Sequence, residues 1–83
     1  MTDDEIRQNI KNNLIDLRKR KGLTQTEIAE IVGKKAPSVA SWEQGISLPD
    51  LQTLYRLSIY YNKMMEYFYE NNPKENEDDS SIH

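Results

Sequence analysis

TQTEIAEIVGKKAPSVASWEQG, the stretch from Thr24 to Gly45, decides the fold of this chain. Its spacing predicts two short helices, over about 25–32 and 36–43, that cross closely around a tight turn. Thr24 and the glutamate three residues later form a capping box, in which each side chain bonds a free backbone N–H at the start of the first helix. The glycine at position 33 can adopt the left-handed conformation that ends this helix.

Small and apolar side chains in this stretch stand where two crossing helices need them. A small residue is required at the crossing point, and Ile28 and Val32 form an apolar stripe that can close on the stripe of the second helix. The predicted packing positions are Ala29, Gly33, Val39 and Trp42. Such a pair of helices is a device for placing the second helix in the major groove of DNA. The same spacing also suits a helical hairpin in any small all-helical domain.

The remaining pattern predicts three further helices and an all-α fold. An apolar face containing Ile6 and Leu17 predicts a helix from Thr2 or Asp3 to Lys21. Pro49 opens a helix that continues to about Tyr61, with Asp50 in its first turn. A short helix follows from Lys63 or Met64 to Tyr69, and Asn71, Asn72 and Pro73 stop it. Residues 1–70 therefore form one domain, and 71–83 form a polar, acidic tail with too little apolar surface to fold.

The acidity of the chain is concentrated near its end. The 83 residues include 11 basic and 14 acidic side chains, for a net charge of −3. From Glu70 onward there are five acids against Lys74 alone, so the first 69 residues carry a net charge of +1. A nucleic-acid partner is therefore not excluded by the overall charge.

Composition argues against several other classes of protein. The chain has no cysteine, its only histidine is His83, and no carboxylate cluster has an acid–base partner, so we expect no enzyme, metal site or cofactor. No signal peptide is visible and no apolar run reaches the roughly 18 residues that span a bilayer, so we expect no membrane association and a cytoplasmic location.

The run from Leu17 to Phe68 resembles the XRE-type helix-turn-helix family, which includes lambdoid phage repressors and Cro. The resemblance is carried by LRKRKGLTQTEIAE, by SVASWEQGISLPDLQTL and by the Tyr-Tyr-Asn and Tyr-Phe groups that follow. It implies a five-helix lambda-repressor-like DNA-binding domain, with the helix-turn-helix in the second and third helices. It also implies a sequence-specific transcriptional regulator, most often a repressor, that binds double-stranded DNA in the major groove.

The resemblance assigns roles to individual residues. Gln25 matches the glutamine that binds a DNA phosphate at a helix N-terminus, although a solvent-exposed role is the alternative. The residues expected to face base edges are Ala36, Pro37 and Ser41. Those expected near phosphates are Thr24, Gln25, Lys34, Lys35, Ser38, Gln44 and Ser47, with ordinary solvated lysines as the alternative for Lys34 and Lys35.

The reading face departs from the family pattern. Many relatives carry side chains there that hydrogen-bond to adenine or guanine, whereas Ala36 and Pro37 offer no such group and Ser41 is short. Lys35 also replaces the usual capping serine or threonine. We therefore expect specificity to depend more on DNA shape and backbone contacts. The operator sequence and the regulated genes do not follow from these residues.

Basic residues precede the motif, and one of them has a structural role in the family. The pattern pairs Arg18 with Glu43, which ties the first helix to the end of the third. The cluster from Arg18 to Lys21 has two interpretations, as a complement to the helix dipole or as a phosphate contact, and both can hold.

Six of the seven aromatic residues lie between Tyr55 and Tyr69, which is more than a small core needs. Either they form an ordinary monomer core or part of the group forms a homodimer interface. The predicted interface residues are Tyr61, Met64, Met65, Tyr67, Phe68 and Tyr69. Two alternatives to plain transcriptional control remain. One is an antitoxin that represses its own operon and binds a toxin, with the acidic tail folding on this basic partner, and the other is an adaptor that uses its helix-turn-helix to bind another protein.

Overall fold

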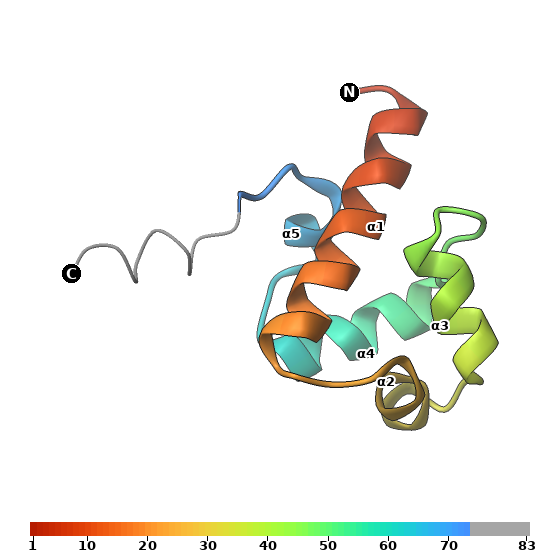
Figure 1. The fold of residues 1–83 in the computed structure, drawn as a ribbon. Helices are drawn as coiled ribbons and strands as arrows, with labels where there is room; N and C mark the ends of the chain where they lie inside the picture. Colours follow the sequence, from red (N-terminus) through yellow and green to blue (C-terminus); the bar gives the residue numbers. More distant parts are fainter. Residues whose placement is uncertain (74–83) are drawn as a thin grey trace.

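A capping box starts the longest helix, α1 (Asp3–Arg20): the Thr2 hydroxyl accepts a hydrogen bond from the Glu5 amide, and the Glu5 carboxylate accepts one from the Thr2 amide. The computed structural model describes residues 1–73, which contain five helices (Figure 1). The others are α2 (Gln25–Val32), α3 (Ala36–Glu43), α4 (Leu51–Tyr61) and α5 (Met65–Tyr69). The predicted all-α fold is confirmed. Most of the predicted tail, from Lys74 onward, lies outside the described residues.

Two predicted helix starts were wrong: α5 begins at Met65 rather than at Lys63 or Met64, and α4 begins at Leu51 rather than at Pro49. Asp50 does not lie in the first turn of α4 but caps it: its backbone is extended, and its carboxylate accepts a hydrogen bond of 2.8 Å from the Thr53 amide. Pro49 precedes the cap and is buried, so it leads the chain into the helix without being part of it. The prediction for α4 failed because Pro favours the first helical position but is also compatible with the extended backbone before a cap.

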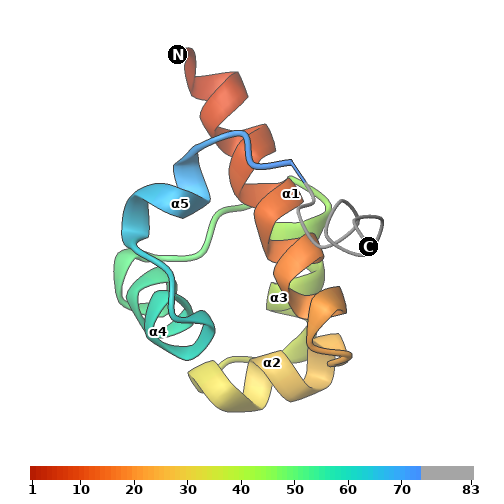
Figure 2. The ribbon, with the colours of Figure 1, turned by 90° about the vertical axis from the view of Figure 1, so that its left-hand side faces the viewer.

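The core lies where the five helices meet. In Figure 2, α4 and α5 lie on one side, α1 and α3 on the other, and α2 runs across the lower end. The buried apolar side chains are Ile10, Leu14, Leu17, Ile28, Ala29, Val32, Val39, Trp42, Leu54, Leu57, Tyr61 and Phe68. The predicted packing residues Ala29, Val39 and Trp42 all belong to this core. Trp42 is therefore a structural residue, and it is not available to stack on a base.

Polar side chains of α1 hold the short helix α5 in place. The Asn13 amide, only 3% exposed, donates to the carbonyl oxygens of Tyr67, Phe68 and Glu70 at 2.9–3.0 Å. One turn earlier, Asn9 donates to the Tyr69 carbonyl at 2.9 Å. Helix α5 is too short to satisfy the carbonyl groups at its own end, so these bonds provide them with hydrogen-bond partners.

The aromatic residues near the end of the domain divide between core and surface. Tyr61 and Phe68 are buried, whereas Tyr55 is 57% exposed. Burial raises the pKa of the Tyr61 phenol, which therefore stays neutral over the physiological range. Among the predicted interface residues, Tyr61 and Phe68 are buried, Met64 is exposed, and Met65, Tyr67 and Tyr69 are partly buried.

Candidate nucleic-acid interface

The turn between α2 and α3 has the geometry that a helix-turn-helix requires. Gly33 ends α2 with φ of 72°, in the left-handed region, and the Lys34 amide then donates to the Ala29 carbonyl at 2.8 Å. A side chain at position 33 would be strained by this backbone, which explains the glycine. Figure 1 views α2 along its axis while α3 runs across the view, so the two helices cross steeply and α3 forms an outer edge of the molecule.

The predicted reading positions lie on or near the surface of α3, but their chemistry is limited. Pro37 is exposed, and Ala36 is partly buried against the core. The Ser41 hydroxyl lies 2.7 Å from the Ser47 hydroxyl, in the loop that follows α3. Ser41 therefore already has one partner within the protein, and a base contact would use the remaining hydrogen-bonding capacity of its hydroxyl.

The predicted phosphate-binding residues fall into two groups. Lys35 and Gln44 are exposed, with Ser38 partly buried between them on α3. Lys35 occupies the capping position of α3 without a side-chain cap bond, as its residue type predicts. The other group already has partners: the Thr24 hydroxyl caps α2, Ser47 bonds Ser41, and Lys34 and Gln25 each bind a carboxylate.

The predicted pair of Arg18 and Glu43 is present and bidentate. Arg18 Nε and Nη2 donate to the two carboxylate oxygens of Glu43 at 2.8 and 2.9 Å. A third donor was not predicted: Gln25 Nε2 bonds Glu43 Oε1 at 3.0 Å. Arg18 Nη1 also donates to the Leu23 carbonyl at 2.8 Å. The network thereby joins the end of α1, the start of α2 and the end of α3.

Electrostatics favour the ionised state of this network. Burial alone would raise the pKa of Glu43, but the hydrogen bonds from Arg18 and Gln25 and the charge of Arg18 outweigh it and lower the pKa. The hydrogen bond to Glu43 raises the pKa of Arg18 in turn. Only 7% of the Glu43 side chain is exposed, so loss of a partner would leave a largely buried charge.

The basic cluster before the motif is largely occupied by contacts within the protein. Besides Arg18, Arg20 pairs with Asp16 at 2.8 Å, and the Lys21 ammonium lies 5.1 Å from the centre of the Tyr60 ring. Lys19 is exposed. Three of the four residues in this cluster thus have a partner within the protein.

An ion pair beside the turn was also missed by sequence reasoning. Lys34 Nζ lies 3.2 Å from Asp50 Oδ2, on an exposed part of the surface. The hydrogen bonds from Thr53, with the contact to Lys34, lower the pKa of Asp50 to about 2. The two residues are 16 positions apart, so no local pattern indicates their contact. They meet because the turn between α2 and α3, where Lys34 lies, is next to the start of α4 in the fold.

Within residues 1–73 no group of His, Cys, Asp or Glu side chains could hold a metal ion. No helix of that same region combines the length and the apolar character that crossing a membrane requires.

Comparison with known protein families gives a match that covers most of the described residues. A family model described as "Helix-turn-helix" covers residues 14–68, from the second half of α1 to the fourth residue of α5, including the crossed pair α2 and α3. No curated protein and no solved structure matches the chain.

Proposed function

Because the chain belongs to the helix-turn-helix family in its Cro/C1-type XRE branch, a family of DNA-binding regulators, we propose that it is a sequence-specific transcriptional repressor acting in the cytoplasm. The proposal places α3 in the major groove of double-stranded DNA, with Ala36, Pro37 and Ser41 toward the bases. Operators of this kind are read by two copies of a protein, so the proposed functional unit is a homodimer.

The network around Glu43 is the observation that carries this proposal. It fixes the start of α2, where Gln25 lies, to the end of α3. A surface that must fit the DNA backbone and the groove at once benefits from such rigidity, because less conformational freedom is lost on binding. The exposed Lys35 and Gln44 lie at opposite ends of α3, where each can reach a phosphate.

Specificity in this proposal depends mainly on the DNA backbone and its shape. Alanine and proline contribute apolar contact with a thymine methyl at most, and the hydroxyl of Ser41 is bonded to Ser47. Ile46, 69% exposed in the loop after α3, adds an apolar side chain beside the proposed phosphate contacts. The expected operator therefore contains base pairs that the protein does not touch but that are selected because they make the DNA easy to deform.

Fluorescence anisotropy with the DNA that flanks the gene, against random DNA, tests the proposal at two salt concentrations. We expect tighter binding to the flanking DNA and a steep loss of affinity as salt rises. Lys35→Ala is expected to weaken binding to all sequences and to reduce the salt slope by about 1. Arg7→Ala, which removes an exposed charge near the start of α1, is the matched control and is expected to leave affinity unchanged.

Two outcomes would redirect the proposal. Equal affinity for both DNAs would contradict sequence-specific regulation. Absence of salt-dependent binding would favour the adaptor, which the weak reading face of α3 allows, and a small toxin-like gene beside this one would favour the antitoxin. Gln25→Ala is a second probe, with circular dichroism to separate a binding defect from damage to the Glu43 network.

A further inference from the structure

The last turn of α3 has no basic residue of its own. Its backbone carbonyl groups give this end of the helix a partial negative charge, and Gln44, which caps it, is neutral. At the other end of α3 the positively charged Lys35 stands at the capping position. The residues of α3 and its caps therefore attract a DNA phosphate to the start of the helix but not to its end.

A lysine from α1 lies beside that end. Gly45 follows the cap of α3 with φ of 76°, and an alanine there would place its Cβ 3.4 Å from Cδ of Lys11. The lysine stem therefore packs across the glycine. Since Nζ is only two bonds beyond Cδ, the Lys11 ammonium lies close to the loop that follows α3.

Arg18 orients the side of α1 that carries this lysine. Lys11 and Arg18 are seven residues apart, so they project from the same side of the helix, two turns from each other. Arg18 bonds Glu43 in the last turn of α3, and Lys11 passes over Gly45 two residues further along. One side of α1 thus follows the end of α3 and the start of the loop after it.

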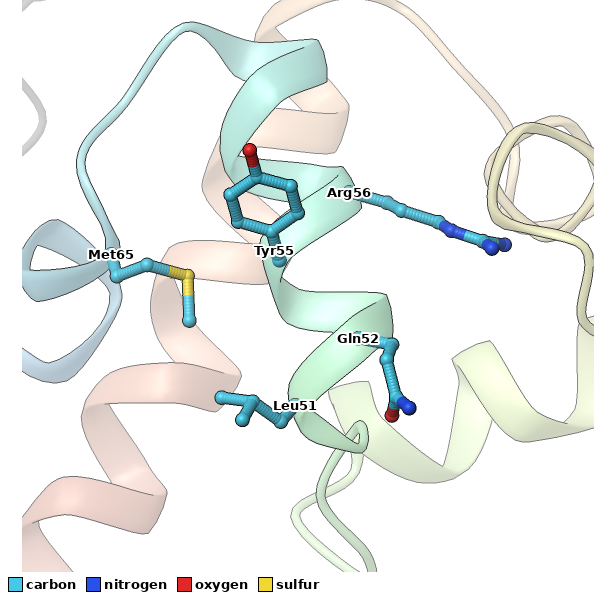
Figure 3. A pocket seen from close by; sticks show the side chains of 5 residues that line it. All are labelled: Leu51, Gln52, Tyr55, Arg56 and Met65. Atoms are coloured by element: carbon cyan, nitrogen blue, oxygen red, sulfur yellow. The ribbon is translucent and has the colours of Figure 1, made fainter.

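Other basic side chains near the helix-turn-helix already have partners. Arg18 and Lys34 each bind a carboxylate. Arg56 donates to a backbone carbonyl at the end of α2, at 3.2 Å, and Figure 3 shows it extending from α4 in that direction. Within residues 1–73, Lys11 takes part in no ion pair, so its charge is available to a ligand.

We propose that Lys11 binds a DNA phosphate from α1 and so extends the DNA-binding surface beyond the helix-turn-helix. It supplies the positive charge that the end of α3 lacks, as Lys35 does at the start. The eight residues of α3 span about 12 Å, several times the rise of about 3.4 Å between successive phosphates of one strand, so the two lysines contact different phosphates. Packing of the Lys11 stem on Gly45 reduces the conformational freedom that the side chain loses on binding. The inference rests on the proposed function, because it takes the docking of α3 on DNA as its premise.

Lys11→Met removes the charge and keeps an apolar stem over Gly45. We expect it to weaken binding to flanking and to random DNA alike, about tenfold at low salt, and to lower the salt slope by about 1 for each copy bound. Lys11→Arg keeps the charge and is expected to bind like the unchanged chain. Circular dichroism checks that both variants are folded.

Arg7→Met is the matched control, because it removes an equal charge from an exposed position one helical turn earlier on α1. It is expected to leave the affinity unchanged. An equal loss in Arg7→Met and Lys11→Met would assign the effect to overall charge and overturn the proposal. Unchanged affinity in Lys11→Met would overturn it as well.

DNA with single uncharged phosphates tests whether the contact is local. One phosphate at a time is replaced by a methylphosphonate, and affinity is measured for the unchanged chain, Lys11→Met and Lys35→Ala. We expect one position at which the replacement weakens binding of the unchanged chain but not of Lys11→Met, and a different position for Lys35→Ala. If every replacement affects Lys11→Met as it affects the unchanged chain, Lys11 contacts no phosphate and the proposal fails.

The same measurements keep this inference apart from the proposed function. If the unchanged chain prefers the flanking DNA and Lys11→Met binds it equally well, the inference fails and the function stands. If the unchanged chain binds no DNA, the proposed function fails and the inference fails with it.

Discussion

Glu43 is the residue on which most of the helix-turn-helix geometry converges. Its carboxylate accepts hydrogen bonds from Arg18 on α1 and Gln25 on α2, while its own backbone ends α3. The same carboxylate also holds the glutamine that the family resemblance assigns to a phosphate. A single side chain thus connects the stability of the domain with the presentation of its proposed DNA-binding surface.

Acid is expected to weaken the domain through this residue. The folded state lowers the pKa of Glu43 from its ordinary value of 4.5, so its ionised form stabilises the fold above that pH. This contribution is lost as the pH falls through the lowered pKa. Glu43→Gln should cost about 2–3 kcal/mol at pH 7 and flatten the acid limb of stability against pH, as measured by urea unfolding.

Glu30→Gln provides the control for this measurement, because Glu30 is exposed on α2. It should leave both the free energy of unfolding at pH 7 and the acid limb close to those of the unchanged chain. An acid limb that is as steep in Glu43→Gln as in the unchanged chain would assign the pH dependence to other carboxylates.

At the scale of elements, α5 depends on α1 for its position. It has five residues, fewer than an isolated helix needs for stability, and its carbonyl groups are satisfied by Asn13. Asn72 adds to the same network by donating to Asn13 Oδ1 at 3.2 Å and to the Tyr67 carbonyl at 2.6 Å. The chain immediately after α5 is therefore part of the packed domain up to this residue.

Asn13→Leu is expected to destabilise the domain by about 1–3 kcal/mol, because it removes the side-chain donor of the buried Phe68 carbonyl and the Oδ1 acceptor of Asn72. Thermal unfolding followed by circular dichroism measures the loss, and hydrogen exchange should show faster opening of α5 than of α2. Asn12→Leu changes an exposed neighbour on the same helix and is expected to have little effect. Similar losses in both variants would show that the effect arises from α1 itself.

The elements were predictable where a local signal marks their ends, and the contacts between them were not. The two ends of α2 are set by signals that act over three or four residues. These are the capping box of Thr24 and Glu27 and the left-handed Gly33. The bond between Ser41 and Ser47 depends on how the loop after α3 folds back, which no periodicity encodes. The family pattern supplied the pair of Arg18 and Glu43 across 25 positions, but it did not supply Gln25 as the third partner.

The burial of the predicted interface residues likewise depends on tertiary packing, which the sequence pattern does not reveal. Sequence reasoning counted the aromatic residues near α5 and could not tell which of them the core would take. Phe68 is fully buried and Tyr61 nearly so, whereas Tyr55 and Ile59, which were not assigned to the interface, remain exposed. Which side of α4 faces inward depends on its packing against α2 and α5.

For the whole molecule, charge differs between residues 1–73 and the last ten residues of the sequence. Residues 1–73 carry ten basic and ten acidic side chains, whereas 74–83 carry Lys74 and four acids. A negative segment joined to a DNA-binding domain competes with DNA phosphates for the same basic residues. Truncation after Pro73 keeps Asn72 and its bonds, and it is expected to raise the affinity for DNA.

Anisotropy at low and at high salt measures this effect, which should be largest at low salt because the competition is electrostatic. The control replaces Glu75, Glu77, Asp78 and Asp79 by the corresponding amides in the full chain, and it should raise affinity as truncation does. Unchanged affinity in both forms would show that the segment has no influence on DNA binding.

The ion pair between Lys34 and Asp50 has a thermodynamic consequence for docking. If Lys34 turned toward a DNA phosphate, it would leave a carboxylate that lies 3.2 Å away in the free protein. Its binding would then be an exchange of one anion for another, and only the difference between the two would appear as affinity. Asp50 would meanwhile keep its place as the cap of α4, since that bond comes from the Thr53 amide. A DNA phosphate must therefore compete with the Asp50 carboxylate for the Lys34 ammonium.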